Sequence, residues 1–221
     1  MHPVALSILV VTLCYTLYYF LFYKHSIVRH WSVSDESGYV RVCVMRIAGF
    51  LIFLLPYLLA VDTLPAPPRQ MTVVQLAGVV GVLAFLLVLI NFFAARNPEN
   101  LAVYPQIRLK KWTAADIVVS AVSWVVYLIG YECLFRGYLF FYSIQYFDLI
   151  SAIGLNVALY VLVHVPKGYK EAFGSIPMGI VLCGVTYYSG SVWPAVVIHS
   201  VLALSNEWFS IYYSYVKANQ S

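Results

Sequence analysis

Four polar side chains interrupt the hydrophobic second half of this sequence and could do chemistry together. Glu132 and Arg136 lie four residues apart in the stretch GYECLFRGYLFF, so on a helix they share one face and can pair directly. His164 and His199 stand in two later hydrophobic stretches. A carboxylate beside imidazoles and a guanidinium suits hydrolysis, because the acid can take a proton from water and the imidazoles can stabilise a tetrahedral oxyanion. The alternative is structural: an ion pair that fixes helices and two histidines that only pack.

The same residues could bind a metal, because two histidines and one carboxylate are a known zinc ligand set with an open position. Glu132, His164 and His199 would be the ligands. The chain contains no HExxH motif, and these ligands would come from three separate helices. The sequence therefore predicts no cofactor, with zinc as a less favoured alternative.

The elements that carry these residues must bring them to one depth inside a membrane. An ionisable residue at the centre of a membrane helix costs about 2.5–3.5 kcal/mol, so it persists where it faces the protein interior and meets a partner. At about 1.5 Å per residue, Glu132 and His164 lie about 20 and 22 Å below the expected outer ends of their helices. Asn156, Tyr160 and His164 recur every four residues, which predicts a polar stripe facing the interior of a helical bundle.

The composition is that of a membrane protein. Of 221 residues, 62% are hydrophobic and 10% charged, whereas a soluble domain has about 25% charged residues. We expect an all-α polytopic transmembrane bundle forming a single domain over residues 1–221, with about seven spans (six to eight). The expected spans are residues 4–23, 43–61, 73–95, 116–145, 150–166, 176–188 and 192–214. The sixth is short, and the loop before it, residues 167–175, could gate entry to the site.

Basic residues gather in alternate loops between these spans. On one side lie Lys24, Arg29, Arg41, Arg96, Arg108, Lys110, Lys111, Lys167, Lys170 and Lys217, whereas the loops on the other side carry Arg69 alone. The positive-inside rule then predicts an N-terminus outside and a C-terminus in the cytoplasm. Short loops favour a bacterial inner membrane over an endoplasmic reticulum membrane, and the basic residues indicate topology, with no nucleic-acid partner. Arg46 lies within a span and is expected to snorkel to the headgroups.

Three motifs in the second half resemble those of one family. Residues 132–137, ECLFRG, resemble the E(E)xxxRG signature of the CPBP (ABI) intramembrane proteases, which include CAAX prenyl endopeptidases. Residues 160–164, YVLVH, are similar to the FxxxH motif of that family, with tyrosine in place of phenylalanine. His199 on a late span resembles the start of its HxxxN/D motif. The ordered trio covers about residues 110–210.

The resemblance implies an α-helical membrane peptidase with its catalytic core in residues 110–210. It implies that Glu132 activates water, that His164 and His199 stabilise the oxyanion, and that Arg136 orients the acid. The partners implied are the lipid bilayer, a membrane-associated protein or peptide substrate, and possible membrane protein complexes.

Two positions depart from the family pattern. Tyr131 stands where the family often has a first glutamate, and would lend a hydroxyl or only pack. Ala203 stands where an asparagine or aspartate is expected, and Asn206, seven residues after His199, could substitute. Tyr131 and Asn206 are therefore supporting candidates, with Tyr160 and Asn156 on the polar stripe. A second hypothesis is a degenerate relative, a membrane scaffold or immunity-type protein that binds a partner without cleaving it.

Overall fold

The structure, a computed structural model, describes residues 2–23, 36–64 and 67–218, which form an all-α bundle as predicted. The longer helices, in chain order, are α1 (Pro3–Tyr23), α3 (Glu36–Ala60), α4 (Val73–Ala94), α6 (Ala114–Glu132), α8 (Leu149–Leu162), α9 (Tyr169–Ser189) and α10 (Trp193–Ala218). The shorter ones are η1 (Val61–Thr63), α5 (Pro98–Val103), η2 (Cys133–Phe140), α7 (Phe141–Tyr146) and η3 (Val165–Lys167).

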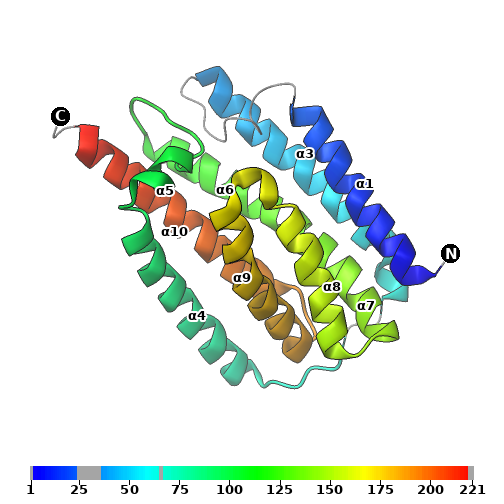
Figure 1. Cartoon of the computed structure of the whole chain (residues 1–221). Helices are drawn as coiled ribbons and strands as arrows, with labels where there is room; N and C mark the ends of the chain where they lie inside the picture. Colours follow the sequence, from blue (N-terminus) through cyan, green and yellow to red (C-terminus); the bar gives the residue numbers. More distant parts are fainter. Residues whose placement is uncertain (1, 24–35, 65–66, 219–221) are drawn as a thin grey trace.

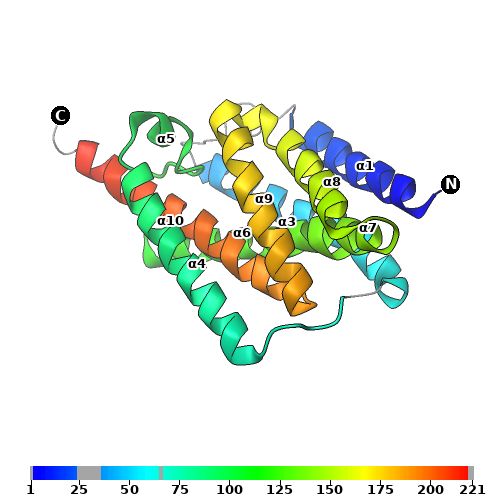
Figure 2. The same ribbon diagram turned by 60° about the horizontal axis from the view of Figure 1, so that its bottom comes forward.

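The helices lie side by side, with α4 at one edge of the bundle and α1 at the other (Figures 1 and 2). Helix α3 packs against α6, α4 against α10, and α8 against α9, while α10 also contacts α6 and α9. The middle of the bundle therefore consists of α6, α9 and α10. Glu132 lies at the end of α6, and His199 lies on α10.

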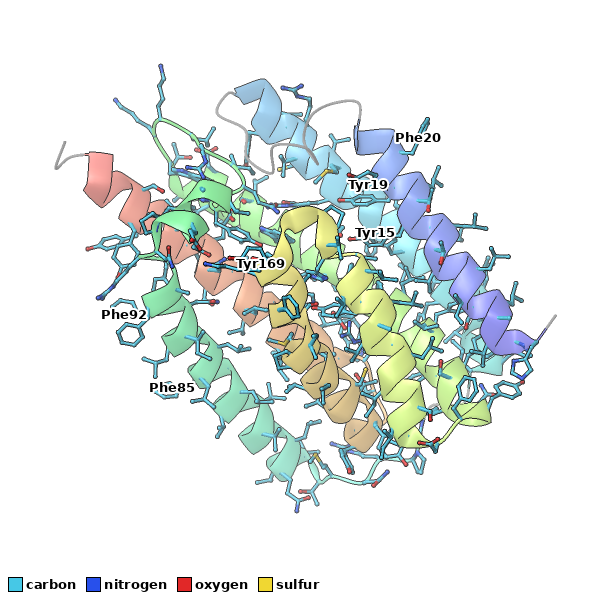
Figure 3. All side chains as sticks on the ribbon, viewed as in Figure 1. Tyr15, Tyr19, Phe20, Phe85, Phe92 and Tyr169 are labelled. Atoms are coloured by element: carbon cyan, nitrogen blue, oxygen red, sulfur yellow. The ribbon has the colours of Figure 1, made fainter. Side chains whose placement is uncertain are left out.

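Five helical segments are long and apolar enough to cross a membrane, and α8 is a shorter apolar helix. The five are Pro3–Phe20, Tyr39–Thr63, Val73–Ala94, Ala114–Tyr146 and Tyr169–Ser189. Helix α4 exposes apolar side chains on its outer face, with Val74 82% and Phe85 66% exposed, and Phe85 points away from the bundle (Figure 3). Such a surface suits contact with lipid, and the chain is an integral membrane protein.

Several span boundaries differ from the predicted ones. Helix α9 begins at Tyr169, so the predicted loop 167–175 and short sixth span are wrong: most of that stretch is the first two turns of a helix of 21 residues. Pro177 lies inside α9, where the membrane environment tolerates a residue that weakens helices in water. Helix α3 likewise begins at Glu36, earlier than the expected residue 43.

Some of the basic residues on which the predicted orientation depends lie outside the described part of the chain. Lys24 and Arg29 lie outside the described residues, as do the side chains of Lys167 and Lys217. The N-terminus outside and the C-terminus in the cytoplasm therefore stay a prediction.

The fourth predicted span is one continuous rod made of α6, η2 and α7. A capping box between Thr113 and Asp116 starts it, because each side chain accepts a hydrogen bond from the backbone of the other residue. Two glycines let α3 approach it closely. A Cβ on Gly130 would lie 2.6 Å from a backbone oxygen of α3, and one on Gly137 would lie 2.5 Å from the ring of Tyr57.

Helix α8 returns from the end of this rod and begins at a defined cap. Asp148 accepts a hydrogen bond from the Ser151 backbone at 3.0 Å and another from its hydroxyl at 2.6 Å. These two bonds stabilise the charged carboxylate and lower the pKa of Asp148. The cap fixes the start of α8, which carries the polar stripe.

Candidate active site

Glu132 stands at the end of α6 with no exposed surface and two charged or titratable partners. Its Oε1 lies 2.5 Å from Nδ1 of His199 on α10, and its Oε2 lies 3.2 Å from Nη1 of Arg136. The same Nη1 donates a hydrogen bond to Oε1 at 3.4 Å. A buried carboxylate is tolerated only with such partners. The structure thus brings three of the four predicted catalytic residues into contact.

Arg136 lies on η2, a π-helical segment whose turn is wider than that of an α-helix. Such segments are rare and are frequently found at functional sites. The Arg136 guanidinium has no exposed surface, and its Cζ lies 4.3 Å from the centre of the Tyr160 ring. An aromatic face at this distance stabilises a cation. Arg136 is therefore held between the Glu132 carboxylate and α8.

The predicted polar stripe on α8 faces the interior. Asn156 is 0%, Tyr160 1% and His164 9% exposed. The Asn156 amide donates a hydrogen bond to the Phe135 carbonyl of η2 at 2.7 Å and accepts one from the Cys183 thiol of α9 at 3.3 Å. Asn156 therefore ties the π-helical segment to two neighbouring helices.

His164 lies just after the end of α8. Its Nδ1 is 2.7 Å from the Tyr160 carbonyl oxygen, which can only accept, so Nδ1 carries a proton. In the neutral ring Nε2 is then the unprotonated nitrogen. His164 lines the same cavity as His199.

That cavity has a volume of about 270 Å³ and lies between α6, α8, α9 and α10. Its wall includes Tyr131, Tyr160 and Asn206, and also Ala203, the position where the family pattern expects asparagine or aspartate. Asn206 thus lines the cavity from the same helix as His199.

The first turns of α9 contribute charged side chains to the cavity wall, and this part of the wall is called the polar end of the cavity. Lys170 and Glu171 line it, and Figure 3 shows their neighbour Tyr169 at the start of that helix. Lys170 forms an ion pair with Glu99 of α5. The stretch predicted as a gating loop therefore lines the cavity as part of a helix.

Tyr131 packs within an aromatic cluster. Its ring is stacked on Phe135 with 4.7 Å between ring centroids, and it meets the His199 ring edge-on at 5.7 Å. The side chain is 3% exposed, and its hydroxyl has no hydrogen-bond partner among the described residues. Both readings of Tyr131, packing and a hydroxyl near the acid, are thus compatible with its position.

No group of three His, Cys, Asp or Glu side chains that could hold a metal ion occurs in the part of the chain that the structure describes. Glu132, His164 and His199 therefore do not form a ready zinc triad here. Glu132 instead contacts an imidazole that lines the cavity, and such a pair can transfer protons.

Residues 112–205 match the family model described as type II CAAX prenyl endopeptidase Rce1-like. This segment belongs to the CPBP/CAAX protease family. No curated protein and no solved structure matches the chain significantly. The match covers less than half of the chain and supports a CAAX-protease-type intramembrane peptidase in general. The four predicted catalytic residues all lie within the CAAX-protease segment, and Asn206 lies just beyond it.

A second buried charged cluster, partly outside the CAAX-protease segment, escaped the sequence analysis. Arg46 is 1% exposed, so the prediction that it snorkels to the headgroups is wrong. Its Nη1 donates to the Ser120 carbonyl and to the Ser123 hydroxyl, both at 3.0 Å. Its Nη2 donates to Gln106 Oε1 at 3.0 Å, and its Cζ lies 4.2 Å from the Trp124 ring. These groups replace the water that snorkelling would have reached.

Glu207 belongs to this cluster and was also missed. It is 1% exposed, and its two carboxylate oxygens accept from the Gln106 backbone N–H at 3.1 and 3.2 Å. The sequence offered one signal for this cluster. Ser120 and Ser123 lie on one face of an apolar helix, and two serines so placed can accept hydrogen bonds from a buried side chain.

Proposed function

We propose that the chain hydrolyses a peptide bond of a membrane-associated protein or peptide, with Glu132 activating water. The observation that supports this best is the 2.5 Å contact between the buried Glu132 carboxylate and Nδ1 of His199, because His199 lines a cavity of about 270 Å³. A carboxylate in this position fixes the orientation of the imidazole and can accept the proton on its Nδ1. Glu132 and His199 would therefore share the proton taken from water, as strongly coupled groups do.

The remaining steps follow from the same geometry. The activated water attacks the scissile carbonyl carbon, and the carbonyl oxygen becomes an oxyanion that faces the imidazoles. His164, whose Nδ1 proton is held by the Tyr160 carbonyl, stabilises the oxyanion through Nε2 when it carries a second proton. The proton held by Glu132 and His199 then passes to the leaving amine as the C–N bond breaks. Arg136 keeps the carboxylate charged and oriented.

We further propose that this chemistry needs no metal. If so, treatment with a strong chelator leaves the cleavage rate unchanged, and metal analysis of the purified protein finds much less than one zinc per chain. Loss of activity on chelation, restored by zinc, would instead indicate the alternative ligand set.

The membrane setting supports a particular orientation. We propose a bacterial inner membrane with the N-terminus outside and the C-terminus in the cytoplasm. Lys170 lines the polar end of the cavity, and the positive-inside rule would place this end on the cytoplasmic side. A substrate would then reach the acid from the cytoplasmic half of the bilayer.

The test compares protein termini in native membranes that carry the wild type or Glu132→Gln at equal abundance. Termini found only with the wild type would support proteolysis and name the substrate. A Glu207→Gln variant at matched abundance is the control, because Glu207 is equally buried and does not contact His199 in the described structure. Identical termini in wild type and Glu132→Gln, together with a co-purifying partner, would favour the non-cleaving scaffold.

A further inference from the structure

Of the nine buried side-chain N and O atoms that lack a hydrogen-bond partner among the described residues, three belong to residues that line the same cavity. They are Nε1 of Trp124, the hydroxyl of Tyr131 and Oδ1 of Asn206. Trp124 is 6% and Tyr131 3% exposed. Buried polar side-chain atoms nearly always have a partner, so three exceptions around one cavity indicate a ligand that supplies the partners.

The three atoms have complementary chemistry. The Trp124 indole nitrogen can only donate, the Tyr131 hydroxyl can donate, and the Asn206 carbonyl oxygen can only accept. A peptide main chain presents the matching groups, because each residue other than proline carries one N–H and one C=O. An apolar ligand such as a lipid chain would leave all three groups unsatisfied.

The spacing also fits a peptide. Trp124 and Tyr131 are seven residues apart on α6, on one face and about 10 Å apart along the helix axis. That distance corresponds to about three residues of an extended chain at about 3.3 Å each. Tyr131 precedes Glu132 directly, so its end of this row lies nearest the acid.

Other contacts hold these side chains in place before any ligand binds. The Trp124 ring lies against the Arg46 guanidinium, with 4.2 Å between Cζ and the ring centre. The Tyr131 ring is fixed between Phe135 and His199. Side chains that are fixed in advance lose little conformational entropy on binding.

We infer that Trp124, Tyr131 and Asn206 bind the main chain of an extended substrate peptide and position it beside Glu132. The inference rests on the proposed function and adds the mode of substrate recognition to it. The two donors hold peptide carbonyl groups, and Asn206 accepts from a peptide N–H. Because the contacts are to the main chain, this part of the site accepts many side chains.

The experiment measures peptide retention by the purified full-length chain carrying Glu132→Gln, with the wild type in parallel. The probe is a panel of capped hydrophobic hexapeptides, each made with normal amides and with the central amides replaced by esters. Retained peptides are quantified by mass spectrometry. Tyr131→Phe, Trp124→Phe and Asn206→Leu are each expected to weaken retention about three- to tenfold, the effect of one lost hydrogen bond.

The ester peptides isolate the contact to Asn206. An ester lacks the N–H, so the ester peptide should bind more weakly than the amide peptide when Asn206 is present. In the Asn206→Leu variant the two peptides should bind equally well. Tyr138→Phe is the matched control: Tyr138 is a buried tyrosine, 6% exposed, that lies on η2 and does not line this cavity.

Each outcome decides the inference. Equal retention by all three variants would mean that water satisfies these groups and would overturn it, as would failure to retain any peptide. Neither result affects the comparison of termini, so the proposed proteolysis would stand or fall separately. Retention with the expected dependence, but no wild-type-specific termini, would identify a peptide-binding scaffold.

Discussion

Two buried arginines in this fold have different surroundings. Arg46 donates through both terminal nitrogens to neutral oxygen atoms of Ser120, Ser123 and Gln106. Arg136 contacts the charged carboxylate of Glu132 through Nη1, while its Nε and Nη2 have no hydrogen-bond partner among the described residues. Arg46 is therefore held by neutral hydrogen-bond acceptors, whereas Arg136 pairs with the carboxylate of Glu132.

The two buried glutamates differ in the same way. Glu207 accepts from a backbone N–H, which cannot change its protonation state. Glu132 contacts His199, which can gain or lose a proton and lines a cavity. A buried charge therefore indicates chemistry when its partner can exchange protons and reach a substrate, and a structural role when its partners are fixed donors.

Exchanging the two acids for amides tests this difference most strongly. Glu132→Gln should lower the cleavage rate per folded molecule at least about hundredfold, the typical contribution of a general base. Glu207→Gln should leave that rate within about twofold while lowering stability, because Gln106 loses a charged acceptor. The rates are measured on the substrate found by comparing termini, and stability by thermal unfolding in detergent. Equal rate losses in the two variants would contradict the distinction.

The next largest effect is expected at Arg46. Arg46→Met removes the donor for acceptor atoms on three residues and leaves them buried, which should cost about 3 kcal/mol of stability. Unfolding of the purified variant in detergent would measure this cost. The rate per folded molecule should fall much less than in Glu132→Gln, because Arg46 acts on the cavity of about 270 Å³ only through the Trp124 ring that it contacts. A stable variant with lost activity would place Arg46 with the catalytic residues.

The two histidines should differ from each other. His199→Gln removes the contact to Glu132 and should slow cleavage about hundredfold or more. His164→Gln keeps a donor on the cavity wall and should cost about tenfold, since one oxyanion donor is altered and others remain. Single-turnover rates at saturating substrate separate these effects from binding. A larger loss at His164 would make it the principal partner of the reacting water.

Part of the site was predictable from the sequence, because its signals are local. The spacing of Glu132 and Arg136 fixes one helix face, and the four-residue repeat from Asn156 to His164 fixes another. Their burial follows from the cost of charge in a membrane. The sequence predicted only that Glu132 and His199 lie at a similar depth in the membrane. The structure shows that they are in contact, with 2.5 Å between Glu132 Oε1 and His199 Nδ1.

The missed features depend on contacts between distant segments. Arg46 meets Gln106 and Ser120 across more than 50 residues, and hydropathy indicates that a residue lies in a span without indicating what lies opposite it. The start of α9 was missed for a local reason: Gly174 and Pro177 weaken helices in water but lie inside this one.

The smallest effect is expected at the polar end of the cavity, where Lys170 pairs with Glu99. Their side chains are 56% and 63% exposed, and such exposed pairs contribute about 0–1 kcal/mol. Lys170→Met should therefore change stability by about 0.5 kcal/mol or less and the cleavage rate by no more than about twofold. High salt screens exposed charges, so it should change the stability of the wild type by a similar amount and leave the stability of the variant unchanged. A tenfold loss of rate at unchanged stability would show that Lys170 contacts the substrate, and would add this end of the cavity to the regions that do chemistry.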